Sequence, residues 1–204
     1  MPSRPTALVI CAGDPARDPR PHRVIRWLSG EFDVRAISSG TTALPGVAHV
    51  RLPAPSGSAV VRKLRGALAL KLRRYEARLW PAGLREIAAA ERARDPALIV
   101  VHDLALLPLA LAIRGSGRVF FDAREYYSRH FEDRWFWRFF LQDFNLHLCR
   151  TYLGKADLMV TVNRGLADEY RREFGVACGV LPSFPESVAL TPGPVEPGKI
   201  RMIH

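Results

Sequence analysis

The stretch ALVICAG, residues 7–13, is an unbroken apolar run that a glycine closes. A run of this kind is typical of a strand that is buried on both faces of a sheet. Further short apolar runs predict six more strands, which cover residues 32–38, 46–53, 97–103, 117–123, 157–162 and 177–182. Buried strands of this type belong to parallel sheets that helices cover on both faces.

Amphipathic stretches separate the predicted strands. Val24, Ile25, Trp27 and Leu28 have helical spacing, and Gly30 follows as a typical helix end. The other predicted helical stretches cover 58–94, 104–114, about 126–155 and 163–174. Because strands alternate with helices, we predict an α/β fold: a Rossmann-like, doubly wound domain with a mainly parallel sheet of about seven strands.

The composition indicates a folded, strongly basic protein. Hydrophobic residues make up 48% and charged residues 25% of the 204 residues, which argues against disorder. Thirty Lys and Arg against twenty Asp and Glu give a formal net charge of +10. Such a surplus attracts anions: nucleic acid, phosphorylated ligands or an acidic membrane surface.

The sequence favours a cytoplasmic protein. No segment has the roughly 18 unbroken apolar residues that a membrane span needs, and the first apolar run is too short for a signal peptide. Cys11, Cys149 and Cys178 form no CxxC pair and lie in apolar runs, so we expect buried thiols in a reducing compartment.

The end of the chain has a different composition. Five of the sixteen prolines lie in 182–199, and such a segment favours an extended spacer. We therefore divide the chain into an N-terminal Rossmann-like domain at 1–182, a Pro-rich interdomain linker at 183–199, and the first strand of a second, truncated domain at 200–204. The alternative for 200–204 is a strand that returns to the sheet of the first domain.

Polar residues cluster where two predicted strands end. In doubly wound sheets, ligands bind at the carboxyl ends of the strands. The residues of this rim are His102, Asp103, Asp122, Arg124, Glu125 and Tyr126. Their side chains suit hydrogen bonding to a polyhydroxylated ligand or proton transfer to a hydroxyl. The alternative is that Asp103 and Asp122 cap the helices that follow them.

The loop after the first predicted strand carries Asp14, Arg17 and Arg20 ahead of a helix. A helix N-terminus with nearby arginines can hold a phosphate or a carboxylate, so these three residues are a candidate anion site. A solvated basic loop is the alternative. The loop has no GxGxxG pattern, which disfavours dinucleotide binding.

Three segments, VVHDLALLPLALAIRGSGRVFFDAREYYSRH (100–130), KADLMVTVNRGLADEYRREFG (155–175) and VLPSFPE (180–186), carry ordered motifs. Their order and spacing resemble the N-terminal domain of family 4 glycosyltransferases. Those enzymes have two Rossmann-like domains, the GT-B architecture. The resemblance extends over about 97–204, and more loosely over the first strand and the helix after it.

The resemblance implies a transferase that moves a sugar from a nucleotide-sugar donor to an acceptor hydroxyl, with retained configuration and no metal. The implied acceptor is a sugar, glycolipid or polysaccharide, which the N-terminal domain holds. The rim residues and Asn163 would bind it. The implied donor is a substrate rather than a cofactor, and a second domain would hold it. Without that domain, this chain is expected to be inactive.

This sequence departs from the family pattern at several motif positions. Arg124 stands where the family has the histidine of its DxHE-like segment, so a role of that imidazole does not carry over. An arginine can instead clamp a phosphate or a hydroxyl. Asn163 replaces a serine, and Ser183 replaces an asparagine. The Gly-Gly loop that many relatives have after the first strand is missing.

Residues 59–80 carry seven basic residues against one acid, with apolar residues at about helical spacing. A basic amphipathic helix suits an anionic lipid surface, so we predict that the protein can sit peripherally on the inner face of the membrane. The alternative is a helix that covers the sheet and has a basic solvated side.

Residues 131–144 contain seven of the nineteen aromatic residues. Their spacing predicts a helix with aromatic residues on more than one side, some of which face an acceptor groove, another domain, a partner chain or a bilayer. A buried helix is the alternative.

Two other classes of function compete with the transferase. A nucleic-acid-binding module would explain the net charge of +10, but the sequence has no recognised binding motif, so nucleic acid is disfavoured as a partner. The second class is a non-catalytic regulatory copy of the domain, which would not need the histidine that Arg124 replaces.

Overall fold

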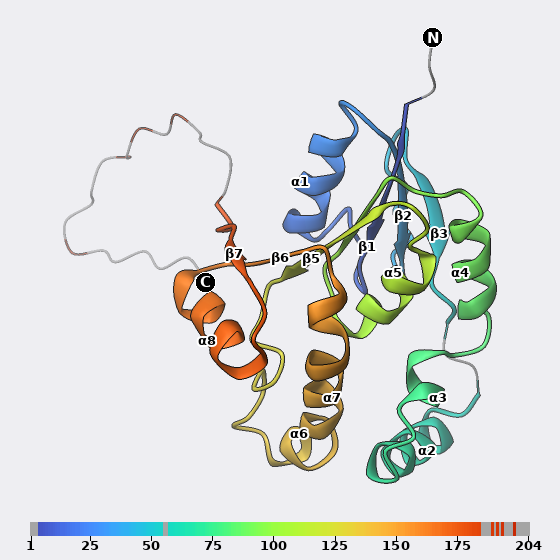
Figure 1. Cartoon of the computed structure of the whole chain (residues 1–204), viewed down its shortest axis with the longest axis vertical. Helices are drawn as coiled ribbons and strands as arrows, with labels where there is room; N and C mark the ends of the chain where they lie inside the picture. The colour runs from blue at the N-terminus through green and yellow to red at the C-terminus, as the bar shows by residue number, and fades with distance from the viewer. Residues whose placement is uncertain are drawn as a thin grey trace.

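The computed structural model describes residues 4–54 and 57–184 and the single positions 189, 191, 193 and 198. The described strands are β1 (Thr6–Ile10), β2 (Asp33–Ser38), β3 (Ala48–Arg51), β4 (Leu98–Val101), β5 (Arg118–Ala123), β6 (Leu158–Thr161) and β7 (Gly179–Val180). They form one sheet in the order β3-β2-β1-β4-β5-β6-β7, and every neighbouring pair is parallel (Figure 1). The predicted seven-stranded parallel sheet is confirmed.

Eight α-helices connect or flank these strands within the described residues. They are α1 (Pro19–Leu28), α2 (Ala59–Lys71), α3 (Glu76–Leu79), α4 (Leu84–Arg92), α5 (Leu107–Ile113), α6 (Trp135–Phe140), α7 (Gln142–Tyr152) and α8 (Arg164–Phe174). Two 3-10 turns, Leu104–Leu106 and Leu153–Lys155, precede α5 and follow α7.

Helices cover both faces of the sheet, because alternate side chains of each strand point to opposite faces. Val9 of β1 packs with Val24 and Ile25 of α1 on one face. Leu8 and Ile10 of the same strand belong to a larger core on the other face, to which α4, α5 and α7 contribute. The doubly wound arrangement predicted from the sequence is therefore confirmed.

The strand order reverses at β1, with β2 on one side and β4 on the other. In open α/β sheets, such a switch point is where a ligand crevice forms beyond the carboxyl ends of the strands. The residues that follow β1, β4 and β5 therefore share one edge of the sheet. The predicted rim lies along this edge.

The predicted helix at 59–80 is wrong as one continuous helix. It is divided into α2 and α3, and α4 follows separately. Arg73, just beyond α2, has a φ of 55°, a left-handed conformation that ends a helix. Gly83, with a φ of 84°, precedes α4. Figure 1 shows α2, α3 and α6 gathered at one end of the molecule.

The predicted helix at about 126–155 is also shorter than expected. Only α6 and α7 are α-helical, and residues 127–133 form turns. The hydroxyl of Tyr127 donates to the backbone oxygen of His102 at 2.9 Å, and that of Tyr126 donates to Glu173. These long-range hydrogen bonds hold the start of the segment against other elements and compete with helix formation.

The predicted strand at 200–204 and most of the predicted linker at 183–199 lie outside the described residues. The three cysteine thiols are buried, as expected. No helix in the described ranges is long and apolar enough to cross a membrane.

Candidate functional site

A buried ion pair lies beneath the carboxyl edge of the sheet. Asp122, in β5, is fully buried. Arg20, in the first turn of α1, donates to both of its carboxylate oxygens at 2.6 Å. Arg20 also donates to the backbone oxygen of Leu181 at 2.9 Å. The bidentate pair therefore ties α1 to the middle of the sheet and to the segment after β7.

His102, directly after β4, completes this buried group. Its Nδ1 lies 3.0 Å from Oδ2 of Asp122, and neither side chain is exposed. Burial by itself would raise the pKa of Asp122. The hydrogen bonds and charges of His102 and Arg20 outweigh that effect and hold the pKa below its usual value. Asp122 is thus a fixed carboxylate at neutral pH.

A second, more open network lies at the mouth of the switch-point crevice. Asp103 accepts a hydrogen bond from the backbone nitrogen of Ala12 at 2.6 Å, which joins the ends of β1 and β4. Arg124 donates to Asp18 at 2.5 Å, and its other terminal nitrogen lies 3.7 Å from Asp103. Burial by itself would lower the pKa of Arg124, but Asp18 and Asp103 outweigh it and raise this pKa.

The capping alternative fails for both aspartates. Asp122 lies within β5, where its side chain binds Arg20. Asp103 precedes a 3-10 turn, but its side chain makes no capping hydrogen bond there. Asn163, in contrast, is a helix cap: its side-chain oxygen accepts from the backbone nitrogen of Leu166 at 2.9 Å at the start of α8.

Glu125 and Tyr126 point in different directions. The carboxylate of Glu125 is half exposed, and its Oε2 lies 3.7 Å from Nε2 of His130. The ring of Tyr126 packs edge-on against Tyr170 of α8, with 5.0 Å between centroids. Burial and the hydrogen bond to Glu173 raise the pKa of Tyr126 to about 12. Tyr126 therefore faces α8, and the structure does not bring it to the rim.

The three candidate anion-binding residues do not form one site. Arg20 is occupied by Asp122. Asp14 accepts hydrogen bonds from the hydroxyl of Thr42 at 2.7 Å and from the backbone nitrogen of Ala16 at 3.0 Å. Of the three, Arg17 alone is exposed. The alternative of a solvated basic loop fits this arrangement better.

Sequence reasoning did not select Asp18 as a site residue. It is the N-cap of α1, accepting from the backbone nitrogen of Arg20 at 3.2 Å, and it also pairs with Arg124. An aspartate directly before a proline is a typical helix start, so the cap could have been found in the sequence. The pairing with Arg124 could not, because the two residues are far apart along the chain.

In outline, the edge has a buried floor of Arg20, His102 and Asp122 and an upper layer of Asp18, Asp103 and Arg124. Glu125 is the exposed carboxylate beside them. Such an arrangement can bind hydroxyl groups through carboxylates and a guanidinium. The described residues contain no group of three His, Cys, Asp or Glu side chains arranged to hold a metal ion.

No protein-family model matches this chain, and no curated protein matches its sequence. Solved structures do match its fold. A lipopolysaccharide outer core galactosyltransferase, WaaB in its apo form, aligns with a TM-score of 0.57 at 9% identity, over 95% of this chain and 50% of that chain. A sucrose-phosphate synthase from Thermosynechococcus elongatus aligns with a TM-score of 0.62 at 14% identity, over 88% and 48%.

The chain thus spans about half the length of these two structures. At such low identity, a structural likeness establishes the fold and leaves activity to be argued from the site. The similarity to GT-B glycosyltransferases indicated by the sequence motifs is supported by the fold. The chain folds as one Rossmann-like domain of the kind found in GT-B glycosyltransferases.

Proposed function

We propose that this chain is the acceptor-side domain of a retaining GT-B glycosyltransferase that resembles family 4. It would act with a donor-binding domain that holds the nucleotide sugar. The observation that carries the proposal is the match of nearly the whole chain to one half of a galactosyltransferase. The ordered motifs at the carboxyl edge of the same sheet support it, because that edge faces the crevice in folds of this class.

In this proposal the exposed groups of the rim bind the acceptor. Glu125 accepts hydrogen bonds from acceptor hydroxyls, and Arg124 donates to them from its position between Asp18 and Asp103. Asn163, which caps α8, lies at the carboxyl end of β6 and contributes a polar group to the same edge. A leaving phosphate can take the hydroxyl proton in a retaining transfer, so the rim needs no separate base.

The buried group beneath the rim positions it. His102 and Asp122 are fully buried and cannot touch an acceptor. The pairing of Asp122 with Arg20 fixes the start of α1, where Asp18 holds Arg124. Preorganised polar groups of this kind stabilise developing charge without reorganising during the reaction.

We further propose that the enzyme works in the cytoplasm, peripherally on the inner face of the membrane, without a metal or a resident cofactor. The sugar, glycolipid or polysaccharide acceptor would reach the rim from that surface. The basic helix α2 supports this placement, since it has no acidic residue in its first turn and ends in Lys71. Basic segments of this kind are attracted to anionic lipid.

The test is a sugar-transfer assay with a panel of nucleotide sugars, run on the chain alone and on the chain combined with its donor-binding domain. The chain alone should be inactive. In the active combination, Arg124→Ala and Glu125→Gln should each lower the rate about tenfold or more, the scale of one lost charge-assisted hydrogen bond. Glu132→Gln, an exposed acid outside the rim, is the matched control.

Thermal unfolding of the same variants separates a loss of rate from a loss of folding. Full transfer rates in folded Arg124 and Glu125 variants would contradict the assignment of the rim. Turnover by the chain alone would contradict the need for a donor-binding domain.

A further inference from the structure

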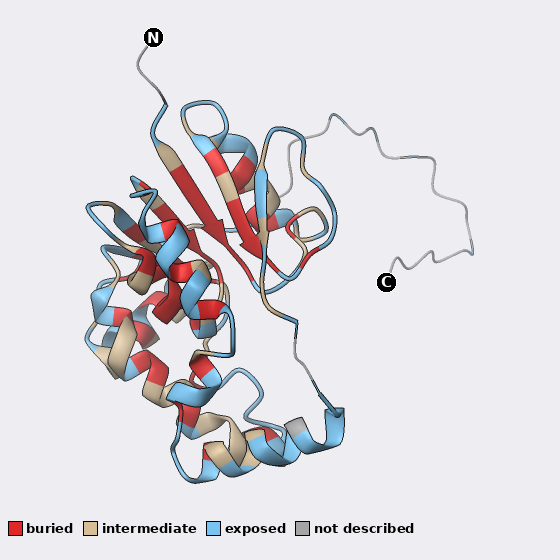
Figure 2. Ribbon diagram, turned by 90° about the vertical axis from the view of Figure 1, so that its right-hand side faces the viewer, coloured by how far each residue is buried: buried red, intermediate tan, exposed pale blue. Residues whose placement is uncertain are grey.

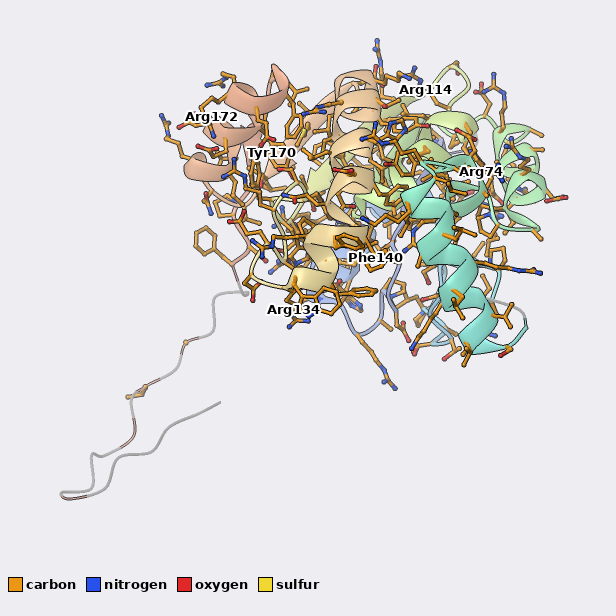
Figure 3. The ribbon with its side chains drawn as sticks, turned by 90° about the horizontal axis from the view of Figure 1, so that it is seen from below. Arg74, Arg114, Arg134, Phe140, Tyr170 and Arg172 are labelled. Carbon is orange, nitrogen blue, oxygen red and sulfur yellow. The ribbon has the colours of Figure 1, made fainter. Side chains whose placement is uncertain are left out.

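A large apolar groove lies at the end of the molecule where α2, α3, α6 and α7 meet. Its volume is about 1360 Å³. Apolar side chains form most of its wall, among them Leu64, Leu70, Phe131, Phe136, Trp137 and Phe140. In Figure 3, Arg134 and Phe140 mark the two ends of α6 on this side of the molecule. Concave, mostly apolar walls are typical of ligand sites.

The groove opens onto an apolar surface that the described part of the protein does not cover. Val60, Leu64 and Leu68 on α2 are 60–65% exposed, and Trp135 on α6 is 70% exposed. Figure 2 shows α2 exposed along most of its length. Exposed apolar surface often marks an interaction site, and tryptophan is enriched where proteins meet membranes.

The charged residues of the groove are all cationic. Its lining includes Lys63, Arg78 and Arg134 and contains no aspartate or glutamate. None of these three cations forms an ion pair with a carboxylate of the residues described. The guanidinium of Arg134 instead lies 4.9 Å from the centre of the Phe131 ring. An apolar groove with unpaired cations is complementary to an anionic amphiphile.

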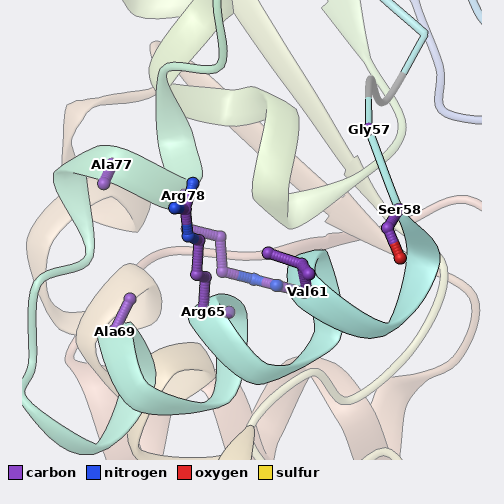
Figure 4. Close-up of a pocket in the computed structure, with 8 residues that line it drawn as sticks. Gly57, Ser58, Val61, Arg65, Ala69, Ala77 and Arg78 are labelled. Atoms are coloured by element: carbon purple, nitrogen blue, oxygen red, sulfur yellow. The ribbon is translucent and has the colours of Figure 1, made fainter.

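Arg78 has no carboxylate partner among the residues that the structure describes. It lines both the groove and a smaller pocket of about 370 Å³ between α2 and α3, the pocket that Figure 4 shows. Desolvation lowers the pKa of Arg78, and its guanidinium lies 5.5 Å from the centre of the Phe144 ring. A phosphate bound here would pair with a charge that the described protein leaves unpaired.

We propose that this groove binds the hydrocarbon chain of a membrane lipid phosphate, with the phosphate held by Arg78 and the neighbouring cations. An inserted chain and a basic patch are the two signals that together give stable membrane attachment. The proposed ligand is a lipid molecule that lies in a bilayer. A soluble anion would leave the apolar walls unused, and an uncharged lipid would leave the cations unpaired.

The groove also adjoins the rim. Ala105, in its wall, follows Asp103 by two residues, and His130, also in its wall, lies 3.7 Å from Glu125. A lipid held in the groove would thus lie beside the residues proposed to bind the acceptor. This step rests on the proposed function, in which the rim binds the acceptor. The acceptor is then a sugar linked to a lipid phosphate.

Titration calorimetry with dodecyl phosphate below its micelle concentration tests the proposal. The probe should bind saturably to the chain, and inorganic phosphate and uncharged dodecyl maltoside should each bind at least tenfold more weakly. Arg78→Gln should weaken binding of dodecyl phosphate about tenfold. Arg74→Gln removes the same charge outside the groove and should change it less than twofold.

A second pair of variants fills the groove without changing charge. Ala67→Phe places a ring in the groove wall and should weaken binding about tenfold, whereas Ala59→Phe adds the same ring to α2 outside both cavities and should leave binding unchanged. Circular dichroism checks folding. If Ala67→Phe does not fold, the comparison of Arg78→Gln with Arg74→Gln still tests the proposal.

Several results would overturn the proposal. One is equal binding of dodecyl phosphate by Arg78→Gln and Arg74→Gln. Another is equal binding of inorganic phosphate and dodecyl phosphate by the unchanged chain. A third is displacement of dodecyl phosphate by a single-stranded oligonucleotide at a lower concentration than by phosphatidylglycerol vesicles. Sugar transfer to a soluble acceptor without lipid binding would refute the groove alone. Lipid binding without sugar transfer in the active combination would refute the proposed function alone.

Discussion

Replacing Arg20 by methionine tests the buried floor of the site most directly. The arginine side chain is 8% exposed, and that of its partner Asp122 is not exposed at all. Arg20→Met keeps most of the side-chain volume but removes both hydrogen bonds to the carboxylate and the bond to Leu181. Asp122 is then a buried carboxylate whose remaining ionisable neighbour is His102.

The expected loss in the free energy of unfolding is large. Three hydrogen bonds that involve a charged group would sum to about 4.5–9 kcal/mol at about 1.5–3 kcal/mol each. The contact of Asp122 with His102 persists, so the loss should lie near the range for breaking one buried ion pair, about 3–5 kcal/mol. This is a substantial part of a typical total stability of about 5–15 kcal/mol.

Urea unfolding at pH 7, followed by fluorescence and extrapolated linearly to water, measures this loss. Arg23→Met is the matched control on the same helix, because Arg23 is partly exposed and binds Ser183 on an exposed segment. It should cost less than about 1 kcal/mol. The double variant Arg20→Met/Asp122→Leu should recover more than about 1 kcal/mol of the loss, since both charges leave together.

A loss below about 1 kcal/mol for Arg20→Met would refute the reasoning, because that value is typical of a solvated pair. Additive effects in the double variant would refute it as well. They would mean that the two charges are not coupled across the interface between α1 and the sheet.

Three further predictions concern other parts of the fold. Hydrogen bonds from the Val119 nitrogen and from Arg118 lower the pKa of Asp157 to about 2. The stability it contributes is therefore present above about pH 4 and lost as the pH falls toward 2, and acid titration of Asp157→Asn should lack that component. Gly40→Ala would place a Cβ 2.7 Å from Cα of Asp14 and should lower the melting temperature, with a cost of about 1–3 kcal/mol. Burial raises the pKa of the Cys149 thiol to about 12, so a thiol-specific reagent should label Cys149 in urea and not in the native protein; labelling at native pH 7 would contradict its burial.

The strands could be predicted because their signal is local. The central strands are runs of mostly apolar residues, short enough to be recognised without knowing their neighbours, as 97–103 and 117–123 show. Helix limits were predicted less well, because they depend on contacts elsewhere in the chain. Tyr127 leaves the helical pattern to bond His102, and nothing in the spacing of 126–155 indicates that bond.

Part of the site could also be predicted from the sequence. That polar residues after β4 and β5 meet at one edge follows from parallel strands, whose carboxyl ends lie together. Their partners do not follow from the sequence. Arg20 was expected to face an anion, yet it binds Asp122, 102 positions away, and Tyr126 was expected at the rim, yet it turns to α8. Pairing of this kind depends on how α1 and α8 cross the sheet.

The apolar side of α2 shows why a periodic pattern needs a structure to interpret it. Residues 59–80 fit a sheet-covering helix and a membrane-facing helix equally well, because both have one apolar side. In the structure, α2 packs on α3 and α6, with Leu70, Tyr75 and Leu79 turned inward. Val60, Leu64 and Leu68 remain exposed. A helix that covered the sheet would bury those three side chains, so the sheet-covering alternative fails, and their exposure beside unpaired cations is what favours an anionic lipid as the missing partner.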